Sequence, residues 1–173
     1  HRHGIIHDCL PTPEGIAVCR DYHIQMPMQS AFIGWKQEPD DYLERILGHD
    51  RLEKLNPIRT FRDNGIVVSF GSDAPCTTPD PIAWMDRAVN NGNAGQAVSV
   101  QDALRMCIYN GAWAAFDEQE RGSLEAGKIA DMAVLSENPY TVPKDKLSGL
   151  RVERLYLGGK PYESCREGIL PMM

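Results

Sequence analysis

The sequence Ile66-Val67-Val68-Ser69-Phe70-Gly71-Ser72-Asp73-Ala74-Pro75 is an apolar segment that ends at an acidic residue. Residues 66–70 are apolar or β-branched apart from Ser69, which is typical of a strand buried on both faces of a parallel sheet. Ligands of α/β folds bind beyond the carboxyl ends of such strands, so we predict a chemical role for Asp73. An Asp in such a turn can also bond its own backbone or cap the next helix, and that alternative stays open.

A second candidate lies in His1-Arg2-His3-Gly4-Ile5-Ile6-His7, which holds three of the five histidines of the chain. The apolar pair before His7 predicts a short strand that ends at this imidazole, a usual way to present a metal ligand. His1 and His3 lie at a terminus that can fray, and no strand precedes them, so we do not predict a chelating pair there. The alternative for the whole cluster is a solvated N-terminal arm.

Between and beyond these candidates, turn and capping residues divide the chain into alternating strands and helices. We predict strands at residues 24–29 and 66–70 and helices at residues 13–22, 40–47, 58–63, 81–90 and 100–116. Successive strands joined by a helix must be parallel, with right-handed connections. Gln29, at the end of the first of these strands, is a candidate for lining a site through its amide; an exposed loop glutamine is the alternative.

Residues 30–56 form a long, less regular stretch that contains Phe32, Trp35 and the predicted helix 40–47. Loops of this length in compact enzymes often cover a substrate pocket, although Trp35 can instead pack on the neighbouring helix. From Arg121 onward the pattern changes to a turn-rich stretch, strands at residues 130–135 and 152–157, and a hairpin at Gly158-Gly159. We therefore predict two units, residues 1–120 and 121–173, the second antiparallel and without a catalytic role.

Composition narrows the function classes. A chain of 173 residues with 42% hydrophobic residues can bury a core, and a net charge of -6 without long basic runs argues against nucleic acids and anionic membranes as partners. No apolar run has the length of a membrane span. The five cysteines are scattered and lack a C-x-x-C pair, which favours reduced thiols in a cytoplasmic protein. Because the sequence starts inside an apparent structured element, we expect it to be a piece of a longer protein.

Two groups of motifs resemble one family. Residues 122–135 (GSLEAGKIADMAVL) with Leu157-Gly158-Gly159-Lys160 resemble the end of an amidohydrolase superfamily enzyme, where the chain returns from a barrel to a small β-sandwich. Residues 70–75 resemble the end of barrel strand 8, and residues 2–7 resemble an Arg-His-Arg-Ile-Glu-His run that ends strand 6. Together they point to amidohydrolase family 3, the branch of N-substituted formamide deformylases and exoenzyme-type metal-dependent hydrolases.

The resemblance covers essentially all of this chain but only the last part of the family's chain. It implies an α/β fold: the last strands and helices of a (β/α)8 TIM-type barrel, which is incomplete here, plus part of a β-sandwich. It implies metal-dependent hydrolysis of an amide or another non-peptide C–N bond of a small-molecule substrate, with a divalent metal, zinc being the expected ion.

By the same resemblance, His7 is similar to the strand-6 metal ligand, Asp73 to the strand-8 acid that contacts metal and moves the proton, and Gln29 to a strand-7 residue that faces the substrate. The chain departs from the family's pattern at Gly4 and Ile6, where Arg and Glu are usual. The missing Glu is an expected partner of His7, and such partners orient metal-binding imidazoles.

The family's remaining ligands, a His-x-His pair, a lysine and a further histidine, would all precede His1. We therefore expect this chain alone to be an inactive C-terminal fragment that binds metal weakly or not at all. Exposed barrel strands predict self-association. Two alternatives stay open: a non-catalytic scaffold or binding domain that keeps the amidohydrolase fold without its metal chemistry, and an autonomous α/β binding domain.

Overall fold

A computed structural model describes residues 1–163; the last part of the predicted second unit, residues 164–173, and Cys165 lie outside the described residues. In chain order the elements are α1 (Pro13–Asp21), β1 (Met26–Met28), η1 (Ser30–Phe32), α2 (Asp40–Leu47), α3 (His49–Leu52), α4 (Ile58–Asp63), β2 (Val68–Phe70), α5 (Pro81–Val89), α6 (Val100–Cys107), α7 (Tyr109–Ala114), β3 (Met132–Leu135), η2 (Lys144–Gly149), β4 (Val152–Leu157) and β5 (Lys160–Pro161).

Three parallel segments position the candidate residues. Strand β1 pairs with β2 in parallel, with Met26 opposite Val68. On the other side of β1, residues 3–7 add a third parallel segment, because the Ile5 amide donates to the Gln25 carbonyl at 3.0 Å and the His7 amide to the Pro27 carbonyl at 3.2 Å. The carboxyl ends of all three segments therefore lie at one edge, as the strand–helix–strand order predicts.

Close packing accounts for one of the two departures from the family's pattern. A Cβ atom at Gly4 would lie 3.1 Å from the Gln25 Cγ atom and 3.4 Å from the Pro27 Cδ atom. These distances leave no room for a long side chain at this position unless Gln25 moves. Glycine thus fits the approach of residues 3–7 to this particular β1 sequence.

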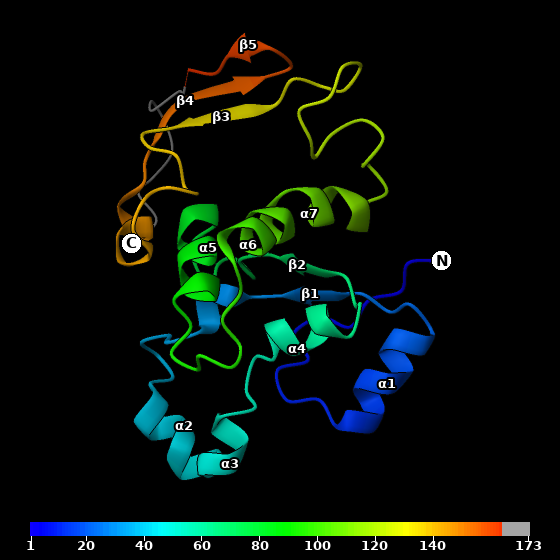
Figure 1. Cartoon of the computed structure of the whole chain (residues 1–173), viewed down its shortest axis with the longest axis vertical. Helices are drawn as coiled ribbons and strands as arrows, with labels where there is room; N and C mark the ends of the chain where they lie inside the picture. Colours follow the sequence, from blue (N-terminus) through cyan, green and yellow to red (C-terminus); the bar gives the residue numbers. More distant parts are fainter. Residues whose placement is uncertain (164–173) are drawn as a thin grey trace.

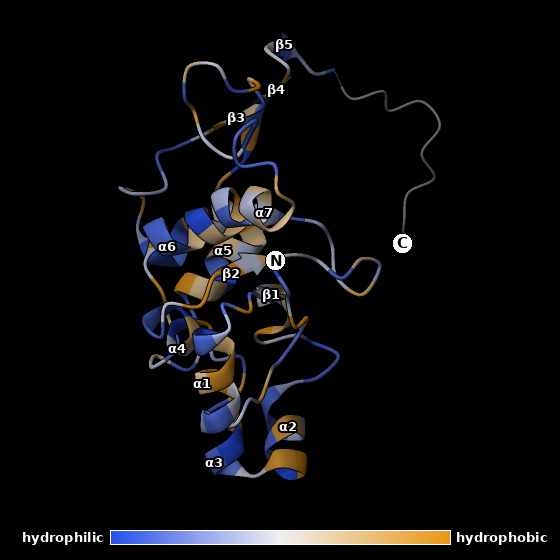
Figure 2. Cartoon of the chain, turned by 90° about the vertical axis from the view of Figure 1, so that its right-hand side faces the viewer, coloured by the Kyte–Doolittle hydropathy of each residue, from blue (hydrophilic) through white to orange (hydrophobic). Residues whose placement is uncertain are grey.

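Helices cover both sides of the parallel strands. In Figure 1, α5, α6 and α7 lie above β1 and β2, whereas α1 and α4 lie below them, and the antiparallel strands β3 to β5 lie beyond the upper helices. The core between these layers contains Met26, Phe61, Val68 and Met85, each at most 1% exposed. Figure 2 shows apolar residues on α2 as well, away from this core, where Tyr42 and Ile46 are about half exposed.

Local capping residues set most helix ends where the sequence predicts them. The Thr12 hydroxyl accepts a hydrogen bond from the Gly15 amide at 3.1 Å, the Asp80 carboxylate accepts from the Ile82 and Ala83 amides, and Ser99 accepts from Asp102. Proline at the first helical position also favours the start of α1 and of α5. Helices α2 and α4 have the predicted bounds, while α3 was not predicted. No helix within residues 1–163 is long and apolar enough to span a bilayer.

The prediction of one helix over residues 100–116 is wrong. The chain forms α6 and α7 with a break at Ile108, whose ψ of -76° departs from helical geometry and whose side chain is 53% exposed. Asn110 follows the break and donates from its side-chain amide to the Val68 carbonyl of β2 at 2.7 Å. This long-range hydrogen bond fixes the start of α7, so the helical spacing of apolar residues did not reveal the break.

The C-terminal part forms the predicted antiparallel hairpin and also reaches the core. Strands β3, β4 and β5 pair in that order, and Gly158 and Gly159 both have positive φ, as a two-residue hairpin turn requires. Between β3 and β4, however, η2 returns to α5 and buries Leu147 completely. The division of the chain at residue 120 stays a prediction. Leu147 belongs to the predicted second unit by sequence but lies in the core of the first.

One ion pair joins the N-terminal segment to the turn after α7 and makes the free energy of unfolding depend on pH in the acid range. Hydrogen bonds from the Arg2 guanidinium at 2.8 and 2.5 Å lower the pKa of Glu118 from its usual 4.5 to about 2. The folded-state pKa is the lower one, so this stabilisation is present above pH 4.5 and is lost as the pH falls toward 2. Arg2 also lies over the Trp113 and Phe116 rings.

We therefore expect Glu118→Gln to flatten the pH dependence of the free energy of unfolding between pH 4.5 and 2. Urea titrations at several pH values in this window measure it. Glu120→Gln is the matched control, because Glu120 is exposed and should leave the slope unchanged. Equal slopes for both variants would refute the role of the Arg2–Glu118 pair.

Candidate functional site

His7 and Asp73 meet at the carboxyl ends of the parallel segments. The His7 Nε2 atom lies 3.7 Å from the Asp73 Oδ2 atom, and the two side chains are 44% and 42% exposed. The sequence predicts this meeting, because both residues end strands of one parallel sheet. As an exposed ion pair it would contribute little to stability, so packing alone does not explain the arrangement.

Both residues have an uncommon backbone conformation. The φ angle is +76° at His7 and +53° at Asp73, a left-handed region that residues with a Cβ atom rarely adopt. Conformations of this kind cost about 1–3 kcal/mol each and cluster at functional sites. The sequence carries no signal for them, because neither position is a glycine.

Hydrogen bonds within the turn hold Asp73. The Cys76 amide donates to the Asp73 carbonyl at 2.8 Å, the Thr77 hydroxyl donates to the Ser72 carbonyl at 2.5 Å, and the Ala74 amide donates to the Ser72 hydroxyl at 3.2 Å. One of these bonds uses the Asp73 carbonyl and two use Ser72, and the Asp73 carboxylate faces His7. The helix-cap alternative for Asp73 is wrong, because Asp80 caps α5.

An aromatic stack orients the His7 ring. Its centroid lies 5.9 Å from that of Phe32 at an interplanar angle of 15°, and Phe32 in turn stacks on Trp35 at 5.0 Å. Sequence reasoning missed this contact, because Phe32 lies in the irregular stretch after β1 and nothing in its neighbours points to His7. The family's pattern has a glutamate partner one residue before this histidine, and this chain has Ile6 there. In this chain the stack on Phe32 is the contact that holds the imidazole.

Phe32→Leu tests this stack. Loss of the ring should shift the ring-proton NMR signals of His7 downfield and remove an aromatic pair that contributes about 0.5–1.5 kcal/mol. Two-dimensional 1H–13C spectra of the histidine rings provide the measurement. Phe116→Leu, at a 64% exposed position without a His7 contact, should leave these signals in place. Unchanged His7 signals in Phe32→Leu would contradict the stack.

Gln29 follows β1 at the same edge of the sheet and is 7% exposed. Its Oε1 atom is buried and has no hydrogen-bond donor among residues 1–163. Its Nε2 atom lies near Gly71, since a Cβ atom there would be 4.0 Å away. The exposed-loop alternative is therefore wrong, because Gln29 is buried and its oxygen is unpaired within residues 1–163.

The His7–Asp73 pair fits two positions of a zinc site. Two ligands of one zinc ion, each about 2.1 Å from the metal at a tetrahedral angle, lie roughly 3.4 Å apart. The observed separation of 3.7 Å is close to this value, and nitrogen and carboxylate oxygen are zinc donors. Among residues 1–163, however, no group of three His, Cys, Asp or Glu side chains could hold a metal ion. A catalytic zinc ion takes three protein ligands, so this pair alone is incomplete.

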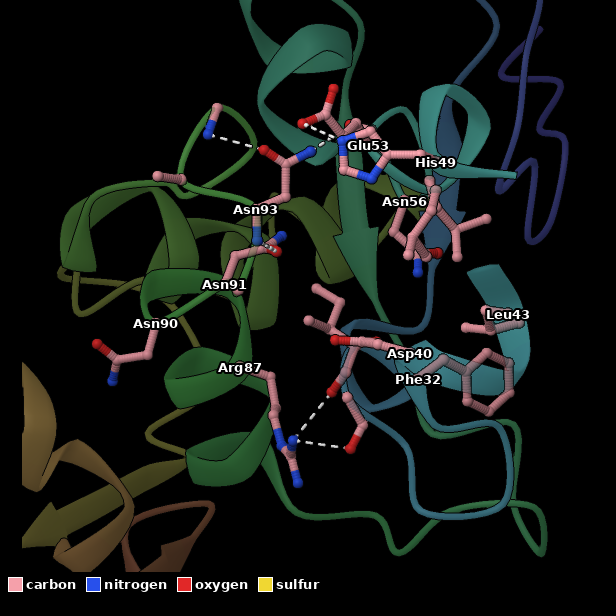
Figure 3. Close-up of a pocket in the computed structure, with 17 residues that line it drawn as sticks. Phe32, Asp40, Leu43, His49, Glu53, Asn56, Arg87, Asn90, Asn91 and Asn93 are labelled. Atoms are coloured by element: carbon pink, nitrogen blue, oxygen red, sulfur yellow. Dashed lines mark hydrogen bonds and ion pairs between the residues drawn. The ribbon is translucent and has the colours of Figure 1, made fainter. Parts of the chain in front are cut away.

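A cavity of about 590 Å³ adjoins the pair through Phe32. Figure 3 shows it between residues of the 30–56 stretch, including Phe32 and Asn56, and residues at the end of α5 and in the following loop, including Arg87 and Asn91. Residues of this stretch do line a cavity, and its role as a substrate pocket stays a prediction. Neither His7 nor Asp73 is among its lining residues.

Comparisons with known proteins agree with this geometry. Residues 1–162 match the amidohydrolase family. N-substituted formamide deformylase from Arthrobacter pascens is 36% identical over 132 residues, which are 72% of this chain and 22% of that protein. This chain therefore spans about a quarter of the length of the curated relatives that it matches.

Solved structures show the same fold. An uncharacterized metal-dependent hydrolase from Pyrococcus horikoshii OT3 aligns with a TM-score of 0.68 and 21% identity, over 82% of this chain and 30% of that one. A variant of atrazine chlorohydrolase TrzN from Arthrobacter aurescens TC1, complexed with zinc and atraton, aligns with a TM-score of 0.63 and 20% identity, over 91% of this chain and 35% of that one. The fold class implied by the motifs is thereby confirmed at the level of the metal-dependent hydrolase fold.

Proposed function

Because this chain belongs to the amidohydrolase family, we propose that His7 and Asp73 are two ligands of a divalent-metal site that hydrolyses an amide or another non-peptide C–N bond. The segment of residues 3–7, β1 and β2 are then strands six to eight of a (β/α)8 barrel, and β3 to β5 are part of a β-sandwich. The proposed substrate is a small-molecule amide, since the deformylase relative is named for an N-substituted formamide.

One observation carries the proposal: the 3.7 Å approach of His7 Nε2 to Asp73 Oδ2 at the ends of parallel segments. Two metal-binding atom types converge there from residues far apart in sequence. Both backbones are in a strained conformation that a merely structural pair does not need. The family match and the position of the pair at the strand ends support the same role.

The site residues have separable tasks. When bound, a divalent metal supplies a nucleophilic hydroxide by lowering the pKa of water from 15.7 to about 7. Asp73 accepts the proton that the attacking water releases and then donates it to the departing amine nitrogen, so the carboxylate is restored when the C–N bond has broken. His7 would hold the ion through a ring nitrogen, and its ring stacks on Phe32.

Gln29 is assigned to the substrate. Its buried Oε1 atom lacks a donor within residues 1–163 and can accept the N–H of an amide group. This bond would hold the scissile group without taking part in proton transfer. Gln29 is therefore a binding residue, whereas Asp73 is the catalytic one.

The remaining metal ligands are assigned to other parts of a longer protein. The short match to each relative and the pair's incompleteness as a zinc site support this assignment. On its own this chain is therefore expected to show no turnover with added zinc. Association of isolated chains through the edges of the parallel sheet stays a prediction. The scattered cysteines support a cytoplasmic enzyme.

Metal analysis of the full-length protein tests the proposal. His7→Gln removes one ligand and should lower the bound metal per chain, measured by mass spectrometry after removal of free ions. His3→Gln is the matched control, because His3 is exposed and outside the pair. Full metal content in His7→Gln would refute the ligand role. A metal-free parent protein would favour the non-catalytic scaffold instead.

A further inference from the structure

The cavity next to Phe32 has the size and polarity of a ligand site. Its volume of about 590 Å³ is in the usual range of small-molecule pockets. One wall is apolar and includes Phe32, Leu43 and Leu52, whereas the facing wall carries asparagines of the loop after α5. The first side also carries Asp40, His49 and Glu53, so a ligand there meets apolar and polar groups together.

Two carboxamides in this cavity have unused hydrogen-bonding capacity. Asn56 is 8% exposed, and in Figure 3 no hydrogen bond joins its side chain to another residue drawn. The Nδ2 atom of Asn91 is buried and has no acceptor within residues 1–163, while the Oδ1 atom accepts from the Asn93 amide at 3.0 Å. A buried amide without a partner is costly, so Asn91 is suited to a ligand that completes its bonds, and Asn56 lines the same cavity.

The backbone of Asn56 points to the same conclusion. Its φ of +50° lies in the left-handed region, and its amide and carbonyl are fixed by hydrogen bonds of 2.8 Å with Cys9 and Ile58. These bonds fix the backbone of Asn56 on both sides of the residue. Figure 3 shows Asn56 and Asn91 on facing walls of the cavity, from segments that are far apart in sequence.

The charges around the cavity disfavour an anion. Asp40 and Glu53 line it, and its one arginine, Arg87, already donates to the Ile33 and Gly34 carbonyls at 3.0 and 3.1 Å. A carboxylate or phosphate ligand would therefore meet two lining carboxylates against one guanidinium, whose Nη1 atom already bonds to the protein backbone. A neutral group with both a carbonyl oxygen and an N–H matches the two carboxamides, because it offers Asn91 an acceptor and Asn56 a complementary amide edge.

We propose that this cavity binds a carboxamide of the substrate that the enzyme does not cleave. The assignment of the ligand as substrate rests on the proposed function, whereas the carboxamide binding itself does not. Phe32 connects the two sites, because its ring lines the cavity and also stacks on His7. A substrate with two amide groups can thus place one in the cavity and the other at the His7–Asp73 pair.

Binding of N-acetylglycinamide to the metal-free full-length protein tests the inference without catalysis. With the asparagine side chains 15N-labelled, the amide signals of Asn56 and Asn91 should shift saturably, with a dissociation constant in the millimolar range expected for so small a probe. The signals of Asn110 and Asn138, which lie outside the cavity, should stay in place. Acetate and methylammonium, the anionic and cationic comparison probes, should produce no saturable shift.

A variant pair identifies the contact. Asn56→Gly keeps a residue that accepts positive φ but removes the carboxamide, and should weaken binding about five- to tenfold. Asn138→Gly is the matched control and should bind as the unaltered chain does. Absence of saturable shifts at Asn56 and Asn91, tighter binding of either charged probe, or equal losses in both variants would overturn the inference. These outcomes leave the metal and activity tests of His7 and Asp73 untouched, so the two proposals fail separately.

Discussion

Asp73→Asn in the full-length protein should lower kcat for hydrolysis of an N-substituted formamide by about 10²–10⁴-fold, the range that a positioned general acid–base group contributes. The carboxamide keeps the size of the side chain and an oxygen atom but cannot accept the proton of the attacking water. KM should change less than kcat, because the substrate contacts assigned to Gln29 and the cavity remain. Steady-state kinetics at saturating metal provide the measurement.

Asp80→Asn is the control for this experiment. Asp80 lies in the same connection between β2 and α5, but its carboxylate accepts hydrogen bonds from the Ile82 and Ala83 amides at 3.0 and 3.2 Å. Asparagine caps helices about as well as aspartate, so this variant should keep its activity. A kcat for Asp73→Asn within a few-fold of the unaltered enzyme would rule out its proton-transfer role. If the same variant also lost its bound metal, the main role of Asp73 would be metal binding rather than proton transfer.

The sequence predicts the local features of this fold well because they depend on neighbouring residues. Thr12, Asp80 and Ser99 cap their helices within a few residues, and Gly158-Gly159 forms its own turn. The strand order also follows from short segments, since parallel strands must put their carboxyl ends together. That rule is sufficient to predict that His7 and Asp73 lie at one edge.

The features that the sequence does not predict depend on residues far apart in the chain. The break at Ile108 accompanies a hydrogen bond from Asn110 to β2, and the orientation of His7 depends on Phe32. The side chains of Asn56 and Asn91 line one cavity only because two segments that are far apart in sequence meet there. In each case the local pattern allows several outcomes, and tertiary packing selects one of them.

His7 lies in the proposed site, where this chain departs from the family's pattern. The residue before this histidine, usually a glutamate, is Ile6 here and is 61% exposed. An isoleucine side chain cannot form a hydrogen bond with the imidazole. The Phe32–Trp35 stack restricts the same ring from its face. An edge contact through a hydrogen bond and a face contact through stacking both limit rotation of an imidazole. The stack is therefore the contact of the His7 ring that we expect to restrict its rotation here.

Leu147→Ala should lower the free energy of unfolding by about 2–5 kcal/mol, the usual cost of deleting a fully buried leucine side chain. Leu147 is completely buried, and its segment η2 packs on α5, where the Asn90 side chain also donates to the Lys144 carbonyl at 2.7 Å. Because a domain's total stability is about 5–15 kcal/mol, this loss is large. Urea unfolding followed by tryptophan fluorescence and circular dichroism measures it.

The same experiment tests whether residues 121–163 fold as a separate unit. Leu147 lies beyond the predicted boundary but fills the core of residues 1–120, so both probes should report one transition that moves to lower urea concentration in Leu147→Ala. Leu124→Ala is the matched control, because Leu124 is 80% exposed and its loss should cost little. Two transitions, with only one of them shifted in Leu147→Ala, would instead support independent units that meet at the contact between η2 and α5.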